Sequence, residues 1–200
     1  MTPHNLALIT GASSGIGAAL ARLLASKKIA LILHGRNEQK LDELASSLSS
    51  QVDVSILATD LTKREALISL IREKVPDLVI NNAGFSLYGD ALESSVQEQM
   101  KIHDVNGAAS LEITLEAAHA LLRAKKPGVI LNVSSVLGDI PSPGTAIYGA
   151  SKGFVTLFSQ SLDYEFAPHH IRVLVSCPGQ VVTPFAARAA KKATITRKGP

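Results

Sequence analysis

Residues 6–17 read Leu-Ala-Leu-Ile-Thr-Gly-Ala-Ser-Ser-Gly-Ile-Gly, an apolar run followed by glycines at positions 11, 15 and 17. The run is short and continuous, as in a β-strand, and an amphipathic helical pattern begins at Ile16. Glycines between a strand and a helix allow a tight turn and let backbone N–H groups approach a phosphate at the positive end of the helix. The stretch therefore predicts a strand, a phosphate-binding turn and a helix, the alternative being an ordinary glycine-rich loop.

Five further apolar runs of similar length follow along the chain, separated by longer amphipathic segments. The predicted strands cover residues 6–10, 29–34, 52–57, 78–81, 129–134 and 171–176, and the predicted helices cover residues 16–27, 38–49, 63–74, 96–125 and 146–166. The runs are apolar at successive positions, so each strand must be covered on both faces, which is typical of a parallel sheet between two layers of helices. We expect one α/β domain over residues 1–184, a Rossmann-like doubly wound parallel sheet with three α/β/α layers.

The third predicted helix carries its own start signal. Thr62 precedes it and Glu65 stands three residues later, which is the spacing of a capping box. We therefore expect Thr62 to be the N-cap of this helix.

Length and composition restrict the class of protein. The chain has 200 residues, 46% of them hydrophobic, which is enough for one substantial core. No apolar run approaches the roughly 18 residues of a membrane span, and residues 1–8 lack the features of a secretory signal. The single cysteine, Cys177, excludes an internal disulfide and is compatible with a reducing compartment. We expect a cytoplasmic protein without a membrane span.

The net charge of +3 comes from one end of the chain. Residues 185–200 carry five basic side chains and no acidic one, whereas the rest of the chain has 15 basic and 17 acidic residues. The five are Arg188, Lys191, Lys192, Arg197 and Lys198. We expect residues 185–200 to form a basic tail, either a solvated helix or a frayed end, and no nucleic-acid partner. Contact of the tail with nucleic acid or anionic lipid is the alternative.

The end of the second predicted strand is where a Rossmann-like domain distinguishes two cofactors. An acidic residue there binds the 2′-hydroxyl of NAD, and a cation accepts the 2′-phosphate of NADP. The sequence is His34-Gly35-Arg36-Asn37, with no acid and with one arginine that can bind phosphate through two N–H groups. Arg36 therefore favours NADP(H), with NAD(H) as the alternative if Arg36 is only an exposed residue that ends the strand.

Tyr148 and Lys152 lie four residues apart at the start of the last predicted helix, so their side chains share one face. Forming a tyrosinate at pH 7 means lowering a pKa of about 10 by about 3 units, or roughly 4 kcal/mol. An ammonium group about 4 Å away supplies about that much at an effective dielectric constant of about 20. The spacing predicts an acid/base pair in which Lys152 lowers the pKa of Tyr148.

Six motifs together resemble the classical short-chain dehydrogenase/reductase family, over residues 5–184. In chain order they are Thr10-Gly-Ala-Ser-Ser-Gly-Ile-Gly17, Asn81-Asn82-Ala83-Gly84, Asn106, Ser134-Ser135, Tyr148-Gly-Ala-Ser-Lys152 and Pro178-Gly179-Gln180-Val181-Val182-Thr183. Asp60-Leu61 is similar to the adenine-side pair of the family. The resemblance, strongest to broad-specificity NADP-dependent carbonyl reductases, implies an oxidoreductase that transfers a hydride between NADP(H) and a carbonyl or secondary alcohol.

The resemblance also implies a role for each matching residue. Tyr148 is the general acid/base. Lys152 supports it and binds the nicotinamide ribose, and Ser135 binds the carbonyl oxygen. Asn106 holds a water that relays protons to Lys152, the alternative being a structural buried asparagine, and Ser134 is structural. The residues implied in cofactor binding are Gly11, Ser13, Ser14, Gly15, Ile16, Gly17, Arg36, Asp60, Leu61, Asn82, Ala83, Gly84, Tyr148, Lys152, Pro178, Gly179, Val181 and Thr183.

Apolar side chains cluster in sequence around these motifs. Phe85, Leu87 and Tyr88 follow the first asparagine-rich motif, and Leu137, Ile140 and Pro141 follow the serine pair. They suggest a small-molecule substrate with an apolar carbonyl group, the alternative being ordinary packing of loops.

The chain departs from the family pattern after Pro184. Family members continue into a substrate lid, a helix and a seventh strand, whereas residues 185–200 contain no strand-like run. We therefore expect a fragment or a naturally truncated member, with the sixth strand as an apolar sheet edge. The alternative function is a non-enzymatic NADP(H)-binding regulatory or scaffold protein that has lost turnover with its lid. Family members assemble through two long helices, which implies a homodimer or tetramer through residues 96–125 and 146–166.

Overall fold

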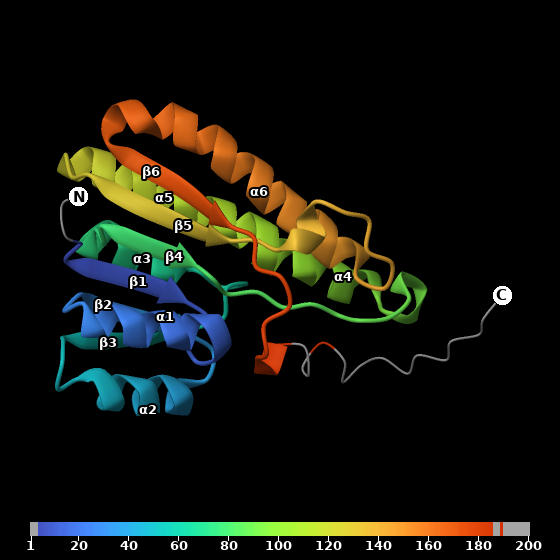
Figure 1. Ribbon diagram of the computed structural model, residues 1–200, viewed down its shortest axis with the longest axis horizontal. Coiled ribbons are helices and arrows are strands. Elements are labelled where there is room, and N and C mark those ends of the chain that lie inside the picture. The colour runs from blue at the N-terminus through green and yellow to red at the C-terminus, as the bar shows by residue number, and fades with distance from the viewer. Residues whose placement is uncertain (1–3, 186–188, 190–200) are drawn as a thin grey trace.

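The computed structural model describes residues 4–185 and residue 189, and these residues form one six-stranded sheet with helices on both faces (Figure 1). The strands are β1 (Leu6–Thr10), β2 (Ala30–Gly35), β3 (Val54–Ala58), β4 (Leu78–Asn81), β5 (Gly128–Val133) and β6 (Ile171–Ser176). The helices are α1 (Gly15–Ser26), α2 (Glu38–Leu48), α3 (Glu65–Lys74), α4 (Val96–His103), α5 (Ala109–Ala124) and α6 (Ala146–Phe166). All strand pairs are parallel, in the order β3-β2-β1-β4-β5-β6. The predicted doubly wound α/β fold is confirmed.

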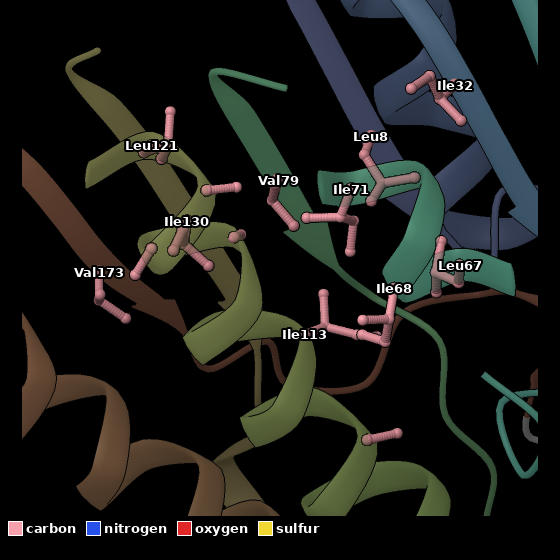
Figure 2. Close-up of a cluster of buried hydrophobic side chains, with 14 of the residues drawn as sticks. Leu8, Ile32, Leu67, Ile68, Ile71, Val79, Ile113, Leu121, Ile130 and Val173 are labelled. Atoms are coloured by element: carbon pink, nitrogen blue, oxygen red, sulfur yellow. The ribbon is translucent and has the colours of Figure 1, made fainter. Parts of the chain in front are cut away.

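The two faces of the sheet carry separate apolar cores, which explains why the strands are apolar at successive positions. On one face Leu8 and Ile32 pack toward α3 and α5 (Figure 2). On the other face Ile9 and Leu33, the next residues of the same strands, pack with the buried alanines and leucines of α1 and α2. Neighbouring side chains of a strand point to opposite faces, so a strand between two helix layers needs apolar residues throughout.

The prediction that Thr62 caps the third helix is wrong. Asp60 Oδ1 accepts hydrogen bonds from the backbone N–H of Thr62 at 2.9 Å and from its hydroxyl at 2.8 Å. Thr62 is therefore held in a turn that Asp60 organises, and α3 begins at Glu65 with Arg64 as its N-cap. The competing side chain was two residues upstream, and an aspartate in a turn bonds the backbone two residues on.

The predicted helix over residues 96–125 is present from Val96 to Ala124, but it is not a regular α-helix throughout. A π-helical segment, η2 (Asp104–Ala108), separates α4 from α5 and buries Val105, Asn106 and Gly107. A π turn inserts one residue into the helical repeat, and such turns are frequent at functional sites. The apolar spacing on either side still matches an α-helix, so the sequence pattern did not reveal the extra residue.

A network of buried amides and hydroxyls joins β4 and β5 to the helices above them. Asn81 Nδ2 donates to Asn132 Oδ1 at 2.8 Å and to the Thr114 hydroxyl of α5 at 3.2 Å. Asn132 Nδ2 in turn donates to the Ser159 hydroxyl of α6 at 2.8 Å. Because buried polar groups require partners, these bonds fix where α5 and α6 lie relative to the strand ends.

Among the described residues, no helix has both the length and the apolar composition needed to cross a membrane. Within the same residues β6 forms one edge of the sheet, as expected, and Leu174 in this strand is 42% exposed.

Burial of His34 makes the fold sensitive to acid. Its ring in β2 is 1% exposed, Nε2 lies 3.1 Å from the Thr59 hydroxyl, and burial lowers the pKa of His34 to about 4. An unfolded chain has a histidine pKa of about 6.5, so it binds more protons between about pH 4 and 6.5. The stability that His34 provides above pH 6.5 is therefore lost as the pH falls toward 4.

We expect the wild-type chain to lose about 3 kcal/mol more unfolding free energy than His34→Gln between pH 7 and about pH 4.5. Urea unfolding of both proteins at the two pH values measures the difference, and the wild-type midpoint should fall further. Equal losses would show that His34 does not titrate in this range.

Candidate active site

The candidate site lies at the carboxyl ends of the strands, at the point where the strand order reverses between β1 and β4. The glycine turn follows β1, residues 82–84 follow β4, and the serine pair follows β5. Because all strands run in the same direction, their carboxyl ends lie together at one end of the sheet. Three stretches that are far apart in sequence therefore meet here.

The glycine turn has the open backbone that a diphosphate group needs. Gly11 has φ 68° and Gly15 has φ 58°, in the left-handed region that favours glycine. A Cβ built on Gly17 would lie 2.5 Å from the Gly11 carbonyl oxygen and 2.6 Å from Asn82 Nδ2. Without side chains at these positions, the N-terminal amides of α1 stay accessible at the positive end of the helix, so the turn fits the diphosphate of a dinucleotide.

Hydrogen bonds from the end of β4 support this turn. The Thr10 hydroxyl accepts the backbone N–H groups of Asn82 at 3.1 Å and of Ala83 at 3.0 Å. Asn82 Nδ2 donates to the carbonyl oxygens of Thr10 at 2.9 Å and of Gly11 at 3.3 Å. Thr10 opens the glycine-rich motif but was not among the residues expected to bind the cofactor, whereas Asn82 and Ala83 were; the structure gives Thr10 the task of holding the turn.

Two candidate residues for the adenosine side form a charged pair. Arg36 Nη1 lies 3.5 Å from Asp60 Oδ2, and the Arg36 side chain is 63% exposed. Burial opposes ionisation of Asp60, but hydrogen bonds from Thr62 and the charges of Lys101 and Arg36 hold its pKa below the ordinary value. Asp60 is thus a carboxylate flanked by two cations, of which Lys101 was not anticipated from the sequence.

The other residues predicted for the adenosine side of the site differ in how they are placed. Ser13 lies beside the strand that leads to Arg36, because its hydroxyl is 3.4 Å from a Cβ built on Gly35. Ser14 precedes α1 as its N-cap residue, and Ile16 is half-buried in the first turn of the helix. Leu61 is 5% exposed and belongs to the core that α3 and α5 cover, so its side chain is mainly structural.

Ser135, Tyr148 and Lys152 are brought together beside the end of β5. Lys152 Nζ donates to the Val133 carbonyl oxygen at 2.7 Å and lies 5.8 Å from the centre of the Tyr148 ring. The neighbouring Ser134 hydroxyl donates to the Lys152 carbonyl oxygen at 2.8 Å, which agrees with a structural role for Ser134. The start of α6 is thereby attached to the end of β5, and the acid/base candidates lie where the two meet.

Protonation in this cluster is governed by burial. Burial raises the pKa of Tyr148, and the hydroxyl of Ser135 partly opposes the rise. Burial also lowers the pKa of Lys152 to about 8. The expectation that Lys152 lowers the pKa of Tyr148 is therefore not met here, because the phenol is desolvated and the amine is directed to the Val133 carbonyl. Lys152 remains mainly protonated at pH 7.

Asn106 lies in the π-helical segment and is completely buried. Its Oδ1 accepts the Phe85 backbone N–H at 3.0 Å, and its Nδ2 donates to the Phe85 carbonyl at 2.9 Å and to the Ser151 hydroxyl at 3.2 Å. A Cβ built on Gly84 would lie 3.0 Å from Asn106 Oδ1 and 3.6 Å from Lys152 Nζ. Gly84 thus allows Asn106 and Lys152 to approach each other, and Asn106 also holds the loop after β4.

The segment after β6 returns to the glycine turn and to the acid/base cluster (Figure 1). A Cβ built on Gly15 would be 3.3 Å from Thr183 Cβ. The Phe185 ring is tilted against that of Tyr148, with centroids 5.7 Å apart. Phe185 was not anticipated from the sequence, because its position depends on how this segment crosses the sheet edge.

The first part of the same segment is less enclosed. The Pro178 carbonyl accepts the Val136 N–H at 3.2 Å, so it lies beside the end of the serine pair. Apart from its two neighbours in the chain, none of the described residues has an atom within 4 Å of a Cβ built on Gly179, and Val181 is 45% exposed. The predicted basic residues of the tail lie outside the described residues. Among the residues described, no group of three or more His, Cys, Asp or Glu side chains is placed to hold a metal ion.

The chain is similar to known proteins over most of its length. Residues 5–194 match the family model described as short chain dehydrogenase. Sulfoacetaldehyde reductase 2 of Chromohalobacter salexigens is 35% identical over 188 residues, which are 90% of this chain and 74% of that protein.

Solved structures match both the fold and the sequence. A short-chain dehydrogenase from Sphingobium yanoikuyae in complex with NADPH has a TM-score of 0.86 at 33% identity, over 93% of this chain and 75% of that chain. A 3-oxoacyl-[acyl-carrier protein] reductase from Brucella melitensis with bound NAD has a TM-score of 0.83 at 28% identity, over 95% of this chain and 76% of that chain.

Proposed function

The chain belongs to the short-chain dehydrogenase family of oxidoreductases, and from this membership we propose that it transfers a hydride between NADP(H) and a carbonyl or secondary alcohol substrate, with Tyr148 as general acid/base. The observation that carries the proposal is the convergence of Ser135, Tyr148 and Lys152 beside a glycine turn that fits a diphosphate. Hydride transfer needs a bound cofactor next to a proton donor, and the proposal is supported by a glycine turn and a buried phenol at the same end of the sheet.

Each residue of the cluster has a separate task. When bound, the nicotinamide supplies or accepts the hydride. Tyr148 donates its phenolic proton to the carbonyl oxygen in reduction and accepts it in oxidation. The Ser135 hydroxyl donates a hydrogen bond to the same oxygen, where negative charge develops. Lys152, whose Nζ lies beside the Tyr148 ring and donates to the Val133 carbonyl oxygen, would hold the nicotinamide ribose of the bound cofactor.

Apolar side chains around the proposed proton donor support an apolar carbonyl substrate. Tyr88 and Ile140, which follow the β4 and β5 motifs, are 44% and 57% exposed, and Phe185 lies against the Tyr148 ring. Phe185 thus provides apolar surface beside the proton donor, and Leu87 lines a pocket together with Tyr148. Asn106 would hold the water of a proton relay to Lys152, since Asn106 Oδ1 and Lys152 Nζ both lie within 4 Å of a Cβ built on Gly84.

The proposal is tested by binding and by turnover. Thermal unfolding of the purified chain with NADPH and with NADH should show a larger rise in Tm with NADPH, since a ligand of the native state stabilises it. NADPH consumption is then followed with aldehydes and apolar ketones. Binding without turnover on any of them would favour the regulatory or scaffold alternative, and no binding of either cofactor would overturn the proposal.

Arg36→Ala tests the choice of cofactor. Charge-assisted hydrogen bonds to phosphate contribute roughly 1.5–3 kcal/mol each, so we expect the ratio of NADPH to NADH affinity to fall about tenfold to a hundredfold. Arg22→Ala is the matched control, because Arg22 is an exposed arginine of α1 whose Nη1 donates to the helix carbonyl of Ala18. If both variants kept the wild-type ratio, Arg36 would not contact the 2′-phosphate.

A further inference from the structure

Arg64 connects two parts of the site that the sequence separates by about forty residues. It stands between the Asp60 turn and α3, and its side chain is only 18% exposed. Nη1 donates to the Leu61 carbonyl oxygen at 2.7 Å and to Asp104 Oδ1 at 3.3 Å, and Nε donates to Glu112 Oε2 at 2.6 Å. One guanidinium therefore holds three acceptors on three different segments.

The first acceptor belongs to the adenosine side of the site. Leu61 follows Asp60, whose carboxylate pairs with Arg36 and organises the turn through Thr62. A bond to the Leu61 carbonyl fixes the backbone that presents the Asp60 carboxylate at the sheet edge.

The second acceptor belongs to the acid/base side. Asp104 is the first residue of the π-helical segment, and Asn106 lies two residues later. The third acceptor, Glu112, is on α5 directly after this segment. Leu61 and Val105 also belong to the same apolar core, so the two segments that Arg64 joins are packed as well as hydrogen-bonded.

We propose that Arg64 is a positioning residue that fixes the π-helical turn of Asn106 to the adenosine-side turn of Asp60. This inference rests on the proposed function for its catalytic meaning. A guanidinium suits the task because its N–H groups lie in a rigid plane, whereas the ammonium of a lysine is a single flexible point. Cofactor binding at the adenosine side and the position of Asn106 then both depend on Arg64.

The chain offers a matched control on the same pair of helices. Arg72 of α3 makes a two-point contact with Glu116 of α5, from Nε at 2.8 Å and from Nη2 at 2.6 Å. This ion pair also joins α3 to α5, but it contacts neither the Asp60 turn nor the π-helical segment. Arg72→Met therefore reproduces the loss of an interhelical ion pair without the loss of the proposed support.

Backbone hydrogen exchange of the full chain without ligand decides the inference independently of turnover. In Arg64→Met we expect the amides of residues 104–110 to exchange about tenfold faster than in wild type, because local opening no longer breaks the Arg64 bonds. In Arg72→Met their exchange should stay at the wild-type rate. Equal exchange in the two variants at residues 104–110 would overturn the inference.

The cofactor fragment 2′,5′-ADP then tests the connection itself. We expect it to slow exchange at residues 58–64 and at residues 104–110 in wild type, but only at residues 58–64 in Arg64→Met. Slowing of both segments in Arg64→Met would contradict a shared support. A fragment that changes exchange nowhere would count against the proposed cofactor site, while the comparison of the unliganded variants would still decide the role of Arg64.

Turnover distinguishes a positioning role of Arg64 from a merely structural one. If Arg64 acts through Asn106, Arg64→Met should lower kcat about tenfold in the wild-type background and less than about twofold in the Asn106→Ala background. Multiplicative effects of the two substitutions would show that Arg64 acts elsewhere.

Discussion

Tyr148→Phe is expected to lower kcat for carbonyl reduction by about a thousandfold, within the range of roughly 10²–10⁴ for loss of a general acid. The substitution removes only the phenolic oxygen. The ring itself should stay buried and in contact with Phe185, so the loss of rate reports the missing proton donor. The affinity for NADPH should fall far less than kcat, since the turn that fits the diphosphate is formed by other residues.

The same helix supplies the control for this experiment. Tyr164 in α6 is 86% exposed, far along the helix from the acid/base cluster, and Tyr164→Phe removes an identical atom. Initial rates of NADPH consumption should be unchanged in Tyr164→Phe and nearly abolished in Tyr148→Phe. Wild-type rates in Tyr148→Phe would mean that another group donates the proton.

Gly17→Ala is expected to have the second largest effect, a fall in NADPH affinity of at least about a hundredfold. The new Cβ would lie 2.5 Å from the Gly11 carbonyl oxygen, and that oxygen is backbone. Relief requires the turn or α1 to shift, and overpacking of this kind costs roughly 1–3 kcal/mol in stability. A shifted turn would no longer direct its amides toward a diphosphate.

Isothermal titration with NADPH measures the affinity, and thermal unfolding without ligand measures the cost to the fold. A variant that melts a few degrees lower and binds weakly would agree with the clash. A variant that binds NADPH as tightly as wild type would show that the turn accommodates a side chain and that the diphosphate lies elsewhere.

The fold was largely predictable because burial on both faces leaves a simple pattern in the sequence. β1, β4, β6 and α6 have the predicted bounds. The errors occurred where one side chain or one residue decides the local structure. Asp60 holds Thr62 in a turn, so Arg64 and not Thr62 is the N-cap of α3, and a single inserted residue formed the π-helical turn. Neither choice changes the apolar periodicity, so neither could be predicted from it.

The residues of the candidate site could be predicted from the sequence, but their pKa values and their long-range partners could not. The motifs identify Tyr148 and Lys152, yet the pKa of Lys152 depends on complete burial beside the Val133 carbonyl, which only the packed structure supplies. Long-range partners were missed for the same reason. Arg64 meets Asp104 and Glu112 across 40 and 48 residues, and nothing in its own neighbourhood of the sequence marks it.

The bonds between Thr10 and Asn82 also affect how the chain acquires this site during synthesis. The glycine turn is complete in sequence by residue 17, but the backbone and amide groups that support it come from Asn82, 72 residues after Thr10. β1 likewise pairs with β4, from which two strand–helix units separate it in the sequence. Non-local pairing of parallel strands is slow because the intervening loop must close first. On the ribosome, the first motif to be translated is therefore among the later ones to become competent to bind a nucleotide.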